Sequence, residues 1–340
     1  MMLSSSSGLW IGLLVLAATA LYTAEAVNNV GVCYGMQGDD LPSPQDVINL
    51  YQKYNIAKIR LFDPVPEALE ALSGSGLEIN IGVTNQDIPT IAQSQEDARA
   101  WFADHISNYL SDMSTLKYIA VGNEVIPDEF SESVLPAMQF LNGVVSELGL
   151  STKITTVVGG KVLGESFPPS ASEFSDASVG YMRDILSFLS STSAPLMVNV
   201  YPYFAYSSDP SHISLAYAQF TSEEVVVRDG DLGYKNIFDA MVDSFVWSME
   251  KANGGDVSIV VSESGWPSAG NGNFTSTELA SSYNTNFFQH VRDPNGTPKR
   301  PGANIEGFIF AMFNEDQKPA GVEQNWGLFY PNMEPVYKVF

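Results

Sequence analysis

The chain has 340 residues, of which 39 are acidic and 16 basic, so its formal net charge at pH 7 is −23. A surface of this sign repels nucleic acid and anionic lipid, and we expect neither as a partner, whereas a neutral substrate is not repelled. The single cysteine, Cys33, excludes an internal disulfide, so a large hydrophobic core must stabilise the fold, and we expect Cys33 to be buried in it.

The first segment with a clear pattern is the apolar run LWIGLLVLAATAL at residues 9–21. It is shorter than the roughly 20 residues that span a bilayer, and a small-x-small sequence, Ala24-Glu25-Ala26, follows it. We interpret residues 1–26 as a secretory signal peptide that is removed, although no basic residue precedes the run. The alternative is an uncleaved membrane anchor. Residues 27–340 are then expected to form a secreted, extracellular domain with no membrane contact.

Beyond this segment, short β-branched runs alternate with longer runs of helical periodicity. The predicted strands are residues 30–34, 58–62, 78–83, 117–123, 153–158, 196–200, 257–262 and 307–313. The predicted helices are residues 44–54, 66–72, 96–111, 134–148, 182–189, 236–252 and 277–291. This alternation is typical of a parallel sheet whose two faces are both covered.

Eight such units predict a single α/β domain with the (β/α)8 TIM-barrel fold. A doubly wound open sheet is the alternative, but no G-x-G-x-x-G motif follows the first strand. Two connections are long, at residues 159–180 and 201–235. We expect a small subdomain after the sixth strand, with a hairpin that turns at Asp229-Gly230. Long connections at this face of a barrel commonly build its active site.

Three predicted strands lead to a glutamate at their carboxyl ends, namely Glu124 after Asn123, Glu263 and Glu315. In a barrel these ends converge on one mouth. Burying a carboxylate there is costly unless it is paired or used, and neighbouring carboxylates push each other's pKa values apart. As a result, one carboxyl group stays protonated while its neighbour is ionised. Glycoside hydrolysis requires such a pair of carboxyl groups. For any one of these glutamates taken singly, the alternative is a structural role at the end of a strand, where a salt bridge holds the side chain.

Aromatic side chains are frequent near the same strand ends. A sugar ring offers an apolar C–H face to an aromatic ring, while its hydroxyls need polar partners. Some of these aromatic residues could instead close the barrel core. The residues expected to contact a sugar are Tyr34, Tyr201, Phe204, Trp266, Phe313 and Asn314.

These segments together resemble the plant β-1,3-glucanases of glycoside hydrolase family 17, and the likeness extends over residues 31–332. The combination of SESGWPS with FNEDQK and EQNWGLF is highly specific. The other matching segments are GVCYG, IRLFDP, YIAVGNE and MVNVYPYFAY.

The resemblance implies a retaining endo-hydrolase of β-1,3-glucosidic bonds in callose or fungal wall glucan. It implies that Glu124 is the acid/base and Glu263 the nucleophile, although older assignments in the family gave the acid role to the position of Glu323. The supporting group that it implies is Asn123, Glu315, Lys318 and Glu323. The alternatives are a mixed-linkage β-1,3;1,4-glucanase of the same family and a glucan-binding protein without catalysis.

One position departs from the family pattern, which usually has Asn where this chain has Asp316. We expect the added negative charge to raise the pKa of the acid or to shift the pH optimum. No catalytic group is lost by this change.

No other chemistry is indicated by the sequence. The three histidines, His105, His212 and His290, lack the spacing of metal ligands, so we expect neither a metal nor a cofactor. No G-x-S-x-G nucleophile motif is present. Asn273 and Asn295 begin glycosylation sequons. We expect the mature protein to act as a monomer on a β-glucan.

Overall fold

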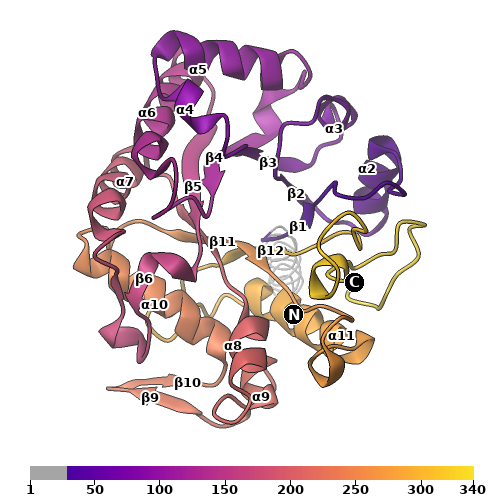
Figure 1. Cartoon of the computed structure of the whole chain (residues 1–340), viewed down its shortest axis with the longest axis vertical. Coiled ribbons are helices and arrows are strands. Elements are labelled where there is room, and N and C mark those ends of the chain that lie inside the picture. The colour runs from indigo at the N-terminus through magenta and orange to yellow at the C-terminus, as the bar shows by residue number, and fades with distance from the viewer. Residues whose placement is uncertain (1–28) are drawn as a thin grey trace, which may run out of the picture.

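The computed structural model describes residues 29–340, so the predicted signal peptide lies outside the described residues. Eight parallel strands close into a barrel in the order β1-β12-β11-β8-β5-β4-β3-β2, and the main helices surround it (Figure 1). The predicted (β/α)8 fold is confirmed. Within residues 29–340, none of the helices has the length and apolar character needed to cross a bilayer.

The barrel strands are short and almost entirely buried, because helices cover their outer face and side chains fill the interior. Their bounds are β1 (Val30–Tyr34), β2 (Lys58–Leu61), β3 (Glu78–Val83), β4 (Leu116–Asn123), β5 (Lys153–Val158), β8 (Leu196–Asn199), β11 (Ile259–Ser264) and β12 (Glu306–Ile309).

Two strands change register at their carboxyl ends. The pairing of β4 with β5 shifts between Ala120 and Asn123, and the pairing of β11 with β8 shifts between Val261 and Glu263. A bulge of this kind turns a side chain away from its regular alternation. Both shifts lie directly beside glutamates that the sequence singled out, so the local backbone helps to direct those side chains into the barrel mouth.

The outer helices begin at residues suited to capping. Ser43, Ser94, Asn236 and Ser276 each accept a hydrogen bond from the backbone N–H three residues on, which satisfies one of the free donors of the first turn. The helices are α2 (Pro44–Lys53), α3 (Pro66–Leu72), α4 (Ile88–Ile91), α5 (Gln95–Phe102), α6 (Ser131–Glu147), α7 (Val179–Thr192), α10 (Ile237–Lys251) and α11 (Thr277–Arg292).

Two predicted elements are much shorter than expected, whereas the other bounds agree with the prediction to within three residues. The helix predicted over residues 96–111 is α-helical only to Phe102, where a π-helical turn follows. The last strand, β12, ends at Ile309 instead of residue 313. Beyond it, the N–H of Ala311 donates to Trp326 O, and Met312 O accepts from Phe329 N. The chain therefore leaves the barrel to pair with its own tail, and Glu315 lies in a loop.

The subdomain comes from two connections, not only from the one after the sixth strand. The β5–β8 connection contains the antiparallel pair β6 (Leu163–Glu165) and β7 (Glu173–Phe174). The β8–β11 connection contains α8 (Pro202–Ser208), α9 (Leu215–Ala218) and the hairpin of β9 (Val227–Asp229) with β10 (Leu232–Tyr234). Ser170 joins the two connections, because its N–H and hydroxyl donate to Asp229 at 2.6 and 2.5 Å. Asp229 pairs with Leu232, so the hairpin turns one residue later than predicted.

Candidate active site

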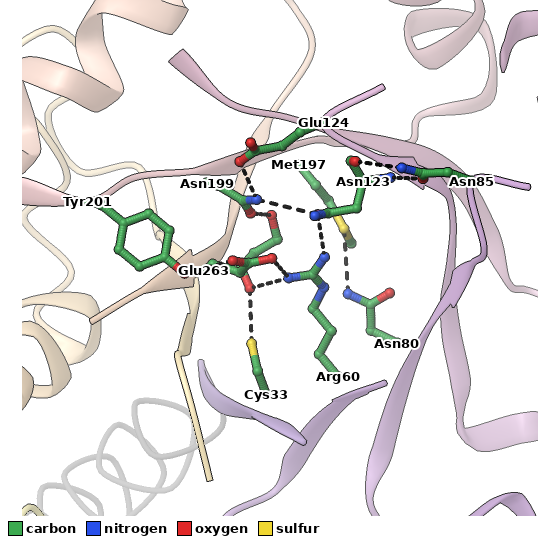
Figure 2. A network of polar contacts seen from close by, with 11 residues as sticks. Cys33, Arg60, Asn80, Asn85, Asn123, Glu124, Met197, Asn199, Tyr201 and Glu263 are labelled. Atoms are coloured by element: carbon green, nitrogen blue, oxygen red, sulfur yellow. Dashed lines mark hydrogen bonds and ion pairs between the residues drawn. The ribbon is translucent and has the colours of Figure 1, made fainter. Parts of the chain in front are cut away.

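Glu263 lies in β11 at the base of the barrel mouth, and only 6% of the residue is exposed. Its Oε1 accepts a hydrogen bond from Arg60 Nη1 at 2.6 Å, and its Oε2 accepts one from the Tyr201 hydroxyl at 2.6 Å (Figure 2). Both carboxylate oxygens are therefore held in place. The guanidinium of Arg60 supplies the opposite charge that a buried carboxylate needs.

Arg60 belongs to the site but was not predicted from the sequence, and the same is true of Asn199 and Phe310. Arg60 lies in β2 and is 1% exposed, and it also donates to Ser262 O at 3.1 Å and to Asn123 Oδ1 at 2.9 Å. Burial works against its charge, but the charge and hydrogen bond of Glu263, together with Cys33, outweigh burial and hold the pKa of Arg60 above its ordinary value. The sequence did contain a sign of its role, because Arg60 lies between the apolar Ile59 and Leu61 within a predicted strand.

Glu124 follows β4 with a backbone φ of 55°, in the left-handed region that is uncommon for a residue other than glycine. Its N–H donates to Val157 O at 3.0 Å, and its Oε1 accepts a hydrogen bond from Asn199 Nδ2 at 2.7 Å. Loss of hydration raises the pKa of Glu124, and the negative charge of Glu263 adds to this, while the Asn199 hydrogen bond acts in the opposite direction. Glu124 is thus suited to carry a proton.

The two glutamates face a common space. A cavity of about 420 Å³ is lined by both, together with Tyr201, Phe204, Glu323 and Trp326. Hydrogen bonds connect the two side chains through Asn199, Asn123 and Arg60 (Figure 2). A second cavity of about 540 Å³ shares Asn123, Glu263 and Phe310 with the first, so together they form one cleft across the barrel mouth.

The supporting residues lie around this cleft. Glu315 is 2% exposed, accepts a hydrogen bond from Gln37 N at 2.8 Å and forms an ion pair with Lys318 Nζ at 2.7 Å. Glu315 and Lys318 line the second cavity with Tyr34, whereas Glu323 lines the first. The structure therefore brings all of the predicted charged residues to one mouth, while their chemical roles stay predictions.

The predicted sugar contacts separate into two groups. Tyr34, Tyr201 and Phe204 line the cleft. Trp266 and Phe313 do not, and their prediction as sugar contacts is wrong, because they are 0% and 1% exposed and pack inside the core.

Other residues take the places that Trp266 and Phe313 were expected to fill. Trp326 and Phe310 form the aromatic wall, with ring centroids 5.7 Å apart. Trp266 stands behind this wall, where its Nε1 donates to Phe274 O. Asn314 does not line either cavity of the cleft, and its Oδ1 accepts from Gly327 N at 2.8 Å, which holds the tail loop.

Asp316 does not act on the acid as expected. It is exposed, and its Oδ1 accepts a hydrogen bond from Asp39 N at 3.2 Å. Its negative charge raises the pKa of Asp39, whereas the charged groups that shift Glu124 are Glu263, Arg60 and Lys161. Asp316 therefore lies at the outer rim, beside Asp39 and Asp40, and the expected effect on the acid is not supported.

The remaining predicted positions differ in exposure. Cys33 is fully buried below Glu263, as predicted, and burial raises the pKa of its thiol to about 12. Asn273 and Asn295 are both exposed, so either could carry a glycan, and their modification stays a prediction.

Comparison with known proteins gives consistent matches over nearly the whole chain. Residues 30–340 match the family described as glycosyl hydrolases family 17. A probable glucan endo-1,3-beta-glucosidase of Arabidopsis thaliana is 50% identical over 317 residues, covering 93% of this chain and 92% of the relative. A putative glucan endo-1,3-beta-glucosidase of Hordeum vulgare is 47% identical, covering 92% of this chain and 97% of the relative.

Solved structures give the same result. One plant beta-glucan endohydrolase, from a study of two such enzymes with distinct substrate specificities, has a TM-score of 0.86 and 43% identity, covering 91% of this chain and 99% of its own. A beta-1,3-glucanase and allergen of Cryptomeria japonica pollen has a TM-score of 0.87 and 43% identity, covering 92% of this chain and 98% of its own.

Proposed function

The chain belongs to glycosyl hydrolases family 17, and from this membership we propose that it cleaves internal β-1,3-glucosidic bonds of 1,3-β-D-glucans such as callose or fungal wall glucan. The observation that carries the proposal is the cavity shared by Glu124 and Glu263, with its aromatic wall. Relatives at 47–50% identity that are named glucan endo-1,3-beta-glucosidases support it. We also propose that the protein is secreted and acts outside the cell as a monomer.

The first chemical step would use both glutamates. The Glu263 carboxylate, held by Arg60 and Tyr201, attacks the anomeric carbon of the bound glucan. Glu124 gives its proton to the departing glucosidic oxygen, so the leaving chain departs as an alcohol and a covalent glycosyl-enzyme forms. The raised pKa of Glu124 favours the protonated form that this step requires.

The second step would release the sugar. Glu124, now ionised, takes a proton from water, and the water oxygen forms a bond to the anomeric carbon. The bond to Glu263 breaks, and its electron pair returns to the carboxylate. Two inversions at the same carbon leave a product with the β configuration of the substrate.

Product analysis on laminarin tests this proposal. We expect a ladder of laminari-oligosaccharides from the earliest times, with newly formed reducing ends that appear first as the β anomer in proton NMR. Release of glucose alone would contradict endo action, and an initial α anomer would contradict the double displacement. Faster release of reducing sugar from a β-1,3;1,4-glucan than from laminarin would favour the mixed-linkage alternative.

Gly159→Ala should reduce activity without unfolding the protein. A methyl group at this position would lie 2.6 Å from Glu124 Oε1, so the carboxyl group must move. The backbone angles of Gly159, φ −108° and ψ −176°, are open to alanine, so stability should change little. We expect kcat on laminarin to fall about 10- to 100-fold, the effect of displacing a catalytic group by about 1 Å.

A glycine outside the cleft provides the control. A methyl group at the exposed Gly180, in α7, meets no atom within 4 Å, so Gly180→Ala should retain kcat within about twofold. Equal losses in the two variants would refute the proposed dependence on the position of Glu124.

The alkaline limit of activity should depend on Asn199. This residue donates to the ionised form of Glu124 and so lowers its pKa; Asn199→Ala should therefore raise the pKa and move the alkaline limb of kcat/KM to higher pH. The positive charge of Lys161 acts in the same direction as Asn199, so Lys161→Met should produce a shift of the same sign.

Profiles of kcat/KM against pH at two salt concentrations check both variants. The Lys161→Met shift should shrink at high salt, because Lys161 is exposed and its charge is screened. A move of the limb to lower pH in Asn199→Ala would be inconsistent with Glu124 as the acid.

A further inference from the structure

The backbone that carries Glu124 has an unfavourable conformation. Glu124 has a φ of 55°, and Gly122, two residues earlier, has a φ of 81°. Glycine adopts this left-handed region freely. For a glutamate the region is strained, and such a conformation persists only where contacts with the surrounding structure enforce it. The segment from Gly122 to Glu124 must therefore be held by groups outside it.

The barrel supplies a backbone partner on one side of this segment only. On the β5 side, Asn123 pairs with Val157, and the N–H of Glu124 donates to Val157 O at 3.0 Å. On the β3 side, the last pair is Val83 with Val121. β4 thus runs two residues beyond its last pair with β3, so the end of β4 needs a different partner on that side.

The side-chain amide of Asn85 takes the place of the missing strand. Its Oδ1 accepts a hydrogen bond from Asn123 N at 2.9 Å, and its Nδ2 donates one to Asn123 O at 3.2 Å (Figure 2). An amide side chain offers an acceptor and a donor side by side, as a peptide group does, whereas an ionised carboxylate could only accept. Asn85 therefore fixes the peptide groups on both sides of Asn123, and the second of these leads directly into Glu124.

The action of Asn85 is directed at Glu124 and not at Glu263. Asn85 lies in the connection between β3 and α4, and within residues 29–340 the hydrogen bonds of its side chain go only to the Asn123 backbone. Glu263 is held separately, by Arg60 and Tyr201 from other strands of the barrel. Loss of the Asn85 amide should thus release the acid/base while the nucleophile keeps its partners.

We propose that Asn85 is a positioning residue for the acid/base: its amide clamps the Asn123 backbone and so directs the Glu124 carboxyl group at the glucosidic oxygen. This inference rests on the proposed function, because it takes Glu124 as the acid/base. Without the clamp, Glu124 can relax towards a commoner backbone conformation, and its carboxyl group moves away from the oxygen that it protonates. A displacement of about 1 Å is enough to lower the rate of proton transfer about 100-fold.

Two substrates with the same sugar but different leaving groups test this role. Phenyl β-laminaritrioside needs a proton as its strongly basic phenolate departs, whereas 2,4-dinitrophenolate is a weak base and departs without one. We expect Asn85→Ala to lower kcat/KM on laminarin and on the phenyl glycoside about 10- to 100-fold. On 2,4-dinitrophenyl β-laminaritrioside, kcat/KM should fall less than about threefold. Equal losses on the two aryl glycosides, or no loss on the phenyl glycoside, would overturn the proposal.

The ratio of the two kcat/KM values excludes the simpler explanations. It does not depend on the fraction of folded enzyme, so a less stable variant cannot imitate the result. Because kcat/KM reports only the steps up to the glycosyl-enzyme, the later action of Glu124 as a base does not enter. A lost contact with the sugar would lower both values alike, because the two substrates carry the same sugar.

Gln86→Ala is the matched control. Gln86 is the next residue, carries the same amide group and lines the same cavity as Asn85, but both bonds to the Asn123 backbone come from Asn85. We expect the ratio of the two kcat/KM values in Gln86→Ala to stay within about twofold of the parent ratio. A change of ratio in Gln86→Ala as large as that in Asn85→Ala would overturn the assignment to Asn85.

A crystal structure of Asn85→Ala provides a readout that needs no activity. We expect Glu124 to leave its φ near 55° or its side chain to occupy more than one orientation, while Glu263 keeps its bonds to Arg60 and Tyr201. An unchanged Glu124 would overturn the clamp.

Failure of this inference can be told apart from failure of the proposed function. If the parent protein cleaves laminarin and Asn85→Ala keeps the parent ratio, the positioning role is overturned and the hydrolase stands. If the parent cleaves none of the three substrates, the proposed function falls, and the catalytic role of the clamp falls with it.

Discussion

Glu263→Gln is expected to remove hydrolysis of laminarin, with kcat lowered about ten-thousand-fold or more. The amide is nearly the same size as the carboxylate, but it lacks the negative charge that attacks the anomeric carbon. The Gln side chain can still accept a hydrogen bond from Arg60 or from Tyr201, so the cleft should keep its shape. Reducing-sugar release at high enzyme concentration, together with circular dichroism of the folded variant, checks this result.

The matched control is Glu323→Gln, because Glu323 lines the same cavity and an older assignment gave its position the acid role. We expect this variant to retain activity within about tenfold of the parent. Activity above about 1% in Glu263→Gln would refute its assignment as nucleophile. A loss in Glu323→Gln as large as that in Glu124→Gln would instead return the acid role to Glu323.

Arg60→Met is expected to lower the free energy of unfolding by about 3–5 kcal/mol and to remove most of the activity. The variant leaves the 6% exposed Glu263 carboxylate without its charge partner. Glu263 would then be poorly placed, and its buried charge would be uncompensated. Urea unfolding at neutral pH measures the loss of stability, and kcat is measured below the unfolding transition.

A double-mutant cycle separates the ion pair from the general packing of Arg60. In the double variant with Glu263→Gln, the loss of stability should be smaller than the sum of the two single losses, because neither side chain is left charged alone. Arg99→Met is the exposed control, because Arg99 pairs with Glu147 at 2.6 Å and both side chains are about half exposed. Arg99→Met should lower the free energy of unfolding by less than about 1 kcal/mol. If the stability losses of Arg60→Met and Glu263→Gln were additive in the double variant, the two side chains would not form a coupled buried ion pair.

Local sequence patterns were sufficient to predict the barrel. The alternation of apolar runs with helical periodicity reflects burial on both faces of parallel strands, and each run predicts its own strand without reference to the others. Glu124 and Glu263 were identified on the same basis, because a carboxylate at the end of an apolar run is conspicuous. The cleft position of Tyr201 and Phe204 followed from their place after a predicted strand.

The partners of these residues were decided only by the closed barrel. Arg60 and Glu263 are 203 positions apart in the chain, and no local pattern relates them. Trp266 follows Glu263 by only three residues, yet it is fully buried, and Trp326 from the tail lines the cleft in its place. Side-chain direction near a bulge, and which aromatic ring is buried beneath another, depend on contacts between distant segments. The sequence by itself therefore determined the strands and the catalytic candidates, whereas the tertiary structure decided which side chains hold them and which ones line the cleft.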